Sequence, residues 1–199
     1  MALAASAAQP LPELRVEPTA GGSIFYIKNG SAQPLTAYLI ELVDYPGSYY
    51  SLWQDDVSTP IAPGAEKRIQ ISNMTVGAVP DYVKMQAALC ADGSSGGIPE
   101  KVTQLVERRR FVLETTRELI RRLEKASAKA AAIADLKQWA DTMRPQGRPN
   151  PKSQATINQS AGRGVIADAA AGLDAHSIEE TLVGLRASER ALAASKPAL

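Results

Sequence analysis

The periodicity of the chain changes near residue 98, and this change limits the folds that are open to it. Before that point, short runs rich in Val, Ile, Leu and Tyr alternate with Gly and Pro, which is typical of strands joined by turns. From Glu100 to Arg144 there is no glycine or proline, and apolar residues recur at steps of three and four, as on one face of a helix. The sequence therefore predicts a segregated α+β fold, with the strands before the helices.

Six runs of β-forming residues predict the strands of the front half. Turn residues such as Pro63-Gly64 and Asp92-Gly93 lie between the runs and suit tight reversals. Strands at this regular spacing are typical of two packed antiparallel sheets, so we assign an immunoglobulin-like antiparallel β-sandwich to residues 11–97. The predicted strands cover residues 14–18, 23–29, 35–43, 49–54, 66–72 and 81–91.

A long amphipathic helix is predicted over residues 98–143, with a possible break near Ser127. Its apolar stripe is heptad-like, and at about 1.5 Å per residue the helix is too long to bury the whole stripe against the sandwich. The stripe must therefore fold back on itself, pair with another chain or stay partly exposed. The residues predicted to form this helix interface are Val102, Leu105, Val112, Leu119 and Leu123.

Both ends of the chain are predicted to be weakly ordered. Residues 144–176 contain three prolines followed by an Ala/Gly-rich stretch, which predicts a linker. Ser177 and Glu180 have the spacing of a capping box, so residues 177–195 predict a short amphipathic helix within a partly disordered helical tail. Residues 1–10 have the small side chains of the end of an export signal, and a disordered terminus is the alternative.

Charge is divided unequally between the two halves. Residues 1–99 carry five Lys/Arg and nine Asp/Glu, and residues 100–199 carry seventeen and twelve, which gives −4 and +5. The basic residues of the predicted helix, such as Arg109 and Arg122, are interleaved with glutamates at spacings that favour ion pairs within a helix. We therefore expect a solvated, salt-bridged helix face and no nucleic-acid partner.

Few residues suited to catalysis or metal binding are present. Cys90 is the one cysteine and His176 the one histidine, so an intrachain disulfide and a thiolate zinc site are excluded. A Ser-His-Asp arrangement would need the histidine of the weakly ordered tail. Gly-rich phosphate loops are absent, and no apolar run approaches the roughly 20 residues that cross a bilayer. We predict a non-enzymatic protein with no cofactor, no metal and no transmembrane segment.

The segment YPGSYYSLWQDD is the most unusual feature of the front half. Rigid aromatic rings with polar tips favour both sugar stacking and protein contacts, and two adjacent carboxylates can bind a hydroxyl group or a cation. The alternative is that these rings fill the core of the sandwich, as a tryptophan often does in such domains. The candidate binding residues are Tyr45, Tyr49, Tyr50, Trp53, Asp55 and Asp56.

Three segments of the front half carry a resemblance to a known group of proteins. They are KNGSAQPLTAYLIELVD at residues 28–44, the turn Ala62-Pro63-Gly64, and AALCADGSSGG at residues 87–97. They resemble exported bacterial proteins that have an immunoglobulin-like sandwich and no assigned activity. The resemblance implies the fold of the first half and export, and it transfers no catalytic residue.

Together these observations favour a structural or accessory subunit of a cell-envelope or secreted assembly. The sandwich would be the recognition surface, and the long helix would bind a protein partner or a second copy of the chain. The expected location is periplasmic or extracellular, with the cytoplasm as the alternative. A second hypothesis is a carbohydrate-binding module that stacks a glycan on Tyr49, Tyr50 and Trp53.

Overall fold

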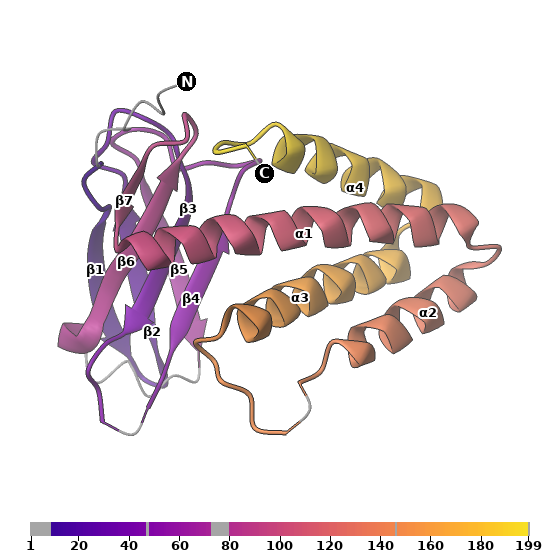
Figure 1. Cartoon of the computed structure of the whole chain (residues 1–199), viewed down its shortest axis with the longest axis horizontal. Coiled ribbons are helices and arrows are strands. Elements are labelled where there is room, and N and C mark those ends of the chain that lie inside the picture. Colours follow the sequence, from indigo (N-terminus) through magenta and orange to yellow (C-terminus); the bar gives the residue numbers. More distant parts are fainter. Residues whose placement is uncertain (1–8, 47, 73–79, 146, 199) are drawn as a thin grey trace. The chain divides into compact units, whose positions relative to one another are not determined.

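The computed structural model describes residues 9–46, 48–72, 80–145 and 147–198 and divides into two compact units. The β unit comprises the chain as far as Leu105 together with Ser195–Ala198, and the helical unit comprises Val106–Ala194 (Figure 1). Two antiparallel sheets of three and four strands precede four helices, which confirms the α+β class. None of the described helices combines the length and the apolar character that crossing a membrane requires.

The described residues of the β unit form seven strands, and all six predicted runs are among them. The additional strand, β7, was missed because its sequence is Ser-Gly-Gly, which has no β propensity. It pairs with β6, and its Ser95 carbonyl accepts a hydrogen bond from the Gln9 amide at 3.0 Å, so pairing rather than propensity makes it a strand. The strands are β1 (Glu13–Thr19), β2 (Gly22–Lys28), β3 (Leu35–Leu42), β4 (Ser51–Asp55), β5 (Glu66–Ser72), β6 (Val83–Cys90) and β7 (Ser95–Gly97), with a 3-10 turn at Pro80–Tyr82 before β6.

The two sheets share one hydrophobic core. Their strand orders are β1-β2-β5 and β4-β3-β6-β7, and every neighbouring pair is antiparallel. Phe25 and Ile27 enter the core from β2, and Tyr38 and Ile40 enter it from β3. All eight residues of β3 are buried, which is typical of a central strand with apolar side chains on both faces.

The helical half differs from the prediction in its number of helices. The single helix expected over residues 98–143 is two helices, α1 (Pro99–Lys125) and α2 (Lys129–Thr142), which are separated at the break expected near Ser127. The predicted short helix is α4 (Ile178–Ala193), and its N-terminus has the predicted capping box between Ser177 and Glu180.

The prediction of a linker over residues 144–176 was wrong, because most of this segment forms the helix α3 (Gln154–Ala175). Ser153 caps this helix by accepting a hydrogen bond from the Thr156 amide. Ile166, Ala169, Ala170 and Leu173 are buried along one face, so tertiary packing outweighs the low helix propensity of the glycines. Among the described residues of the tail, the irregular connection is therefore confined to the stretch between α2 and α3.

The four helices enclose a second core. Part of the apolar stripe predicted for α1 is buried in this core. Leu119 and Leu123 are 0% and 1% exposed and pack with Leu136 of α2 and Leu173 of α3. These parts of the predicted helix interface are therefore buried by the chain's own fold, which corrects the expected role of the stripe in self-association. Leu105 is also buried and lies in the β unit, whereas Val102 and Val112 are half-buried.

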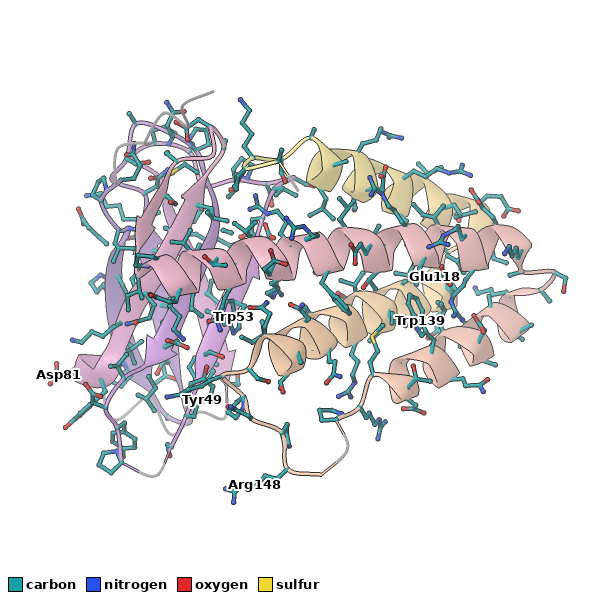
Figure 2. All side chains as sticks on the ribbon, viewed as in Figure 1. Tyr49, Trp53, Asp81, Glu118, Trp139 and Arg148 are labelled. Carbon is teal, nitrogen blue, oxygen red and sulfur yellow. The ribbon has the colours of Figure 1, made fainter. Side chains whose placement is uncertain are left out.

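Ion pairs form within α1, as the interleaved charges predicted. Further ion pairs, which were not predicted, connect α1 to α2 and α4. Arg122 lies 2.8 Å from Glu118 on its own helix and 3.0 Å from Asp135 on α2, and its guanidinium covers the ring of Trp139 (Figure 2). Arg109 is the exception to a solvated basic face, because it is fully buried.

Candidate functional site

The six candidate residues of the aromatic segment do not form one surface. Tyr45 and Tyr50 pack against the core between the sheets, where the Tyr50 ring lies edge-on to Phe25 with ring centroids 6.4 Å apart. Trp53 pairs with Leu39 on the opposite face of the four-stranded sheet, and its indole nitrogen donates a hydrogen bond to the Ser51 hydroxyl at 3.0 Å. The glycan platform of Tyr49, Tyr50 and Trp53 is therefore not assembled, because strand alternation sends neighbouring rings to opposite faces.

The two carboxylates of the same segment, Asp55 and Asp56, also lie in different surroundings. Asp55 ends β4 on the face that holds Trp53. Asp56 accepts a hydrogen bond from the Lys67 ammonium at 2.6 Å, which connects the residue after β4 to β5 of the other sheet. Below it, the Tyr38 hydroxyl is buried without a hydrogen-bond partner among the described residues, and burial together with the Asp56 charge raises the pKa of this phenol.

Tyr49 belongs to a polar cluster that sequence reasoning missed. The carboxylate of Glu41 on β3 is buried, and one of its oxygens accepts hydrogen bonds from the Tyr49 hydroxyl at 3.0 Å and from the Lys101 ammonium at 2.8 Å. Burial, helped by the negative charge of Glu41, raises the pKa of Tyr49 to about 12. Because Lys101 is in the first turn of α1, the cluster fixes the start of this helix to the sheet.

A groove lies between α2 and α3 in the helical unit. Its volume is about 720 Å³, and its floor is apolar, with Leu136 and Ile166 almost fully buried. Exposed small residues, Gly164, Ala167 and Ala171, line its α3 side at spacings that place them on one helix face. The remaining lining residues are Lys137, Ala140, Asp141, Arg144, Ser160, Arg163, Ala170 and Asp174.

Two cations of the groove, Lys137 and Arg163, lack an ion-pair partner among the described residues. Arg144 is paired with Asp141 at 2.9 Å, but no ion pair joins Lys137 or Arg163 to any other residue that the structure describes. Arg163 is also half-buried, so its charge faces the groove from a partly desolvated position. A second hollow of about 350 Å³ beside the α1–α2 turn has its Arg122 already paired with Asp135. The α2–α3 groove is therefore the stronger candidate for a binding site.

The residues suited to metals or nucleophilic chemistry are not gathered in the described ranges. No group of three or more His, Cys, Asp or Glu side chains within residues 9–46, 48–72, 80–145 and 147–198 is arranged to hold a metal ion. Cys90 is a buried free thiol at the end of β6, with the Ser31 hydroxyl 3.8 Å from its sulfur. Comparison of the chain with protein-family models, curated proteins and solved structures finds no match.

Proposed function

We propose that this chain is a non-enzymatic interaction protein, a structural or accessory subunit of a larger assembly, and that the α2–α3 groove binds a helix of the partner. The observation that carries the proposal is the combination of an apolar floor with two cations, Lys137 and Arg163, that have no ion-pair partner among the described residues. Apolar grooves bind amphipathic helices by their apolar face, and unpaired cations select acidic side chains beside that face.

The shape of the groove supports a helix as the ligand. Small residues at an interface allow two helices to approach closely, and Gly164 has open space where a β-carbon would lie. The lining residues of α3 extend from Ser160 to Asp174, which is about 20 Å along the helix axis. This length corresponds to roughly four turns of a bound helix.

The β unit contributes a rigid scaffold in this proposal, and we propose that it is an immunoglobulin-like sandwich. Two features support the assignment: the two sheets share one core, and β1, β2 and β5 are divided from β3, β6 and β7 as strands A, B and E are divided from C, F and G in that fold. Export to the periplasm or the cell exterior stays a prediction, because its N-terminal signal lies almost entirely outside the described residues.

Site-specific photo-crosslinking tests the proposed function. A benzophenone amino acid at Gly164 projects into the groove without a steric clash, and the same amino acid at the exposed Gln138 of α2, outside the groove lining, is the matched control. We expect position 164, but not position 138, to give one dominant protein adduct, in extracts of the source cells or with the purified chain. Arg163→Glu should remove that adduct. Equal adduct patterns at positions 164 and 138 would contradict the proposal.

A further inference from the structure

One exposed face of α4 combines charged residues with apolar ones. Glu179, Val183, Ala187 and Arg190 follow one another at steps of four, four and three, so they lie on one face of the helix. Val183 is 65% exposed, more than any other exposed large hydrophobic residue in the described ranges. No ion pair joins Glu179 or Arg190 to another residue that the structure describes. This face is therefore acidic at its start and basic at its end. Val183 and Ala187 lie in its middle beside Arg186, whose charge is paired with Glu124 of α1.

The α3 side of the groove has the same spacing with the charges reversed. Arg163, Ala167, Ala171 and Asp174 also follow one another at steps of four, four and three, and all four line the groove. Neither Arg163 nor Asp174 forms a side-chain ion pair with a residue in the described ranges. The groove face is therefore basic at its start, small and apolar in its middle, and acidic at its end.

We propose that the helix bound in the α2–α3 groove is α4 of a second copy of this chain, lying parallel to α3. In this register Glu179 meets Arg163, and Arg190 meets Asp174, because each pair of charges is separated by eleven residues, about 16 Å of helix. Val183 then lies over Ala167, where small side chains leave room for it. The proposal rests on the proposed function, since it names the helix that the groove accepts.

The contact joins two different surfaces of the same fold. A contact of this kind is heterologous, so each copy offers one groove and one α4 face, and association continues until a ring closes. We therefore expect a series of species rather than a single symmetric dimer. Because one helix face in one groove is a small interface, association should develop over protein concentrations of about 10 µM to 1 mM.

Sedimentation equilibrium of the full chain over this concentration range is the first test. We expect the mean mass of the wild type to rise above that of one chain, and Val183→Asp and Gly164→Trp each to remain monomeric. Both substitutions are at sites with open space, so unchanged circular dichroism and melting should show that the variants fold. A wild type that stays monomeric to 1 mM, or variants that associate like the wild type, would overturn the proposal.

Mixing the two variants tests the head-to-tail arrangement. Val183→Asp keeps an intact groove and Gly164→Trp keeps an intact α4 face, so an equimolar mixture should form a dimer and no larger species. The absence of a dimer, or growth beyond it, would contradict the proposed contact.

Exchange of charge tests the register. Arg163→Glu and Glu179→Arg should each weaken association about tenfold, and the double variant should recover most of the loss. Arg148→Glu makes the same change of charge in the exposed segment between α2 and α3, outside the groove, and should leave association unchanged. Equal effects of Arg148→Glu and Arg163→Glu, or no recovery in the double variant, would reject the register.

Crosslinking at position 164 separates this inference from the proposed function. An adduct of two copies that joins position 164 to α4 supports both. If the purified chain stays monomeric while position 164 captures a different protein through the groove, the inference is wrong and the proposed function stands. If position 164 gives no more than the control at position 138, both are wrong.

Discussion

The β unit and the helical unit differ in how their charged side chains are paired and in the size of the side chains in their cores. In the β unit, the acids Glu41 and Asp56 form ion pairs with lysines from other elements, and tyrosine rings pack beside the shared core. In the helical unit, the core consists of Leu, Ile and Ala, and the groove keeps Lys137 and Arg163 unpaired with any described residue. The groove lies between helices lined by small residues, which leave space that aromatic rings would fill.

The largest expected effect concerns the stripe of α1, which the helical unit buries. Leu119→Ala should lower the free energy of unfolding by about 2–5 kcal/mol, because Leu119 is fully buried among three other helices. Val112→Ala, at a half-buried position of the same predicted stripe, should cost about 1 kcal/mol. Urea unfolding followed by circular dichroism measures both. If Leu119→Ala changed the mass of the protein in solution and not its stability, the stripe would serve an intermolecular contact after all.

The next largest effect compares ion pairs of the two units. Lys101→Met leaves the buried Glu41 carboxylate with the Tyr49 hydroxyl alone, so we expect a loss of about 3 kcal/mol. Arg121→Met removes an exposed ion pair with Glu118 and should cost less than about 1 kcal/mol. Thermal melting of the two variants makes the comparison. Similar losses would mean that burial does not distinguish the ion pairs of the two units.

Two glycines of α3 should respond differently to the same substitution. A β-carbon at Gly162 would lie 2.8 Å from the Phe111 ring and 3.0 Å from the Met143 sulfur, whereas one at Gly164 meets open space. Gly164→Ala should therefore gain the helix propensity of alanine, about 0.5–1 kcal/mol, and Gly162→Ala should be less stable than Gly164→Ala by about 1–2 kcal/mol. Chemical denaturation of the pair tests this. Equal gains would indicate that the packing at Gly162 yields without cost.

The smallest effect is expected at alkaline pH, and it is specific to the β unit, which holds all six tyrosines. The folded-state pKa of Tyr49 is raised to about 12, so its stabilising contribution is complete below the unfolded pKa near 10. Between pH 10 and 12 the unfolded chain ionises while the folded phenol keeps its proton, and the free energy of unfolding falls. Tyr49→Phe should make this fall less steep, as measured by denaturation at each pH. An unchanged slope in the variant would contradict the pKa.

The strands could be predicted from the sequence because alternation and turn residues are local signals. The run at residues 66–72 coincides with β5, and its alternating Ile69 and Ile71 pack against the core. The Ser-Gly-Gly strand β7 could not be predicted, since its pairing with β6 and Gln9 is a property of the folded chain. For the same reason the sorting of Tyr49, Tyr50 and Trp53 between two faces could be read only once the strand register was known.

The candidate site was harder to predict than the fold. An Ala/Gly-rich stretch predicts a weakly ordered linker by composition. Ser153 is nevertheless a cap signal, and Ile166, Ala169, Ala170 and Leu173 follow one another at helical spacing, so a closer reading could have found α3. The groove itself depends on which face of α2 lies beside which face of α3. Its pairing of Leu136 with Ile166 joins positions thirty residues apart, and no local pattern encodes such a pairing.

The return of Ser195–Ala198 to the β unit has a mechanical consequence. Both described ends of the chain belong to the β unit. A force applied between these two ends therefore acts on the β unit and does not pass through the helical unit. A force that pulls residues 9 and 198 apart is borne by the β unit as long as those four C-terminal residues stay bound. The helices bear the force only after these four residues detach from the β unit. The contacts of Ser195–Ala198 therefore determine the force at which the helical unit begins to unfold.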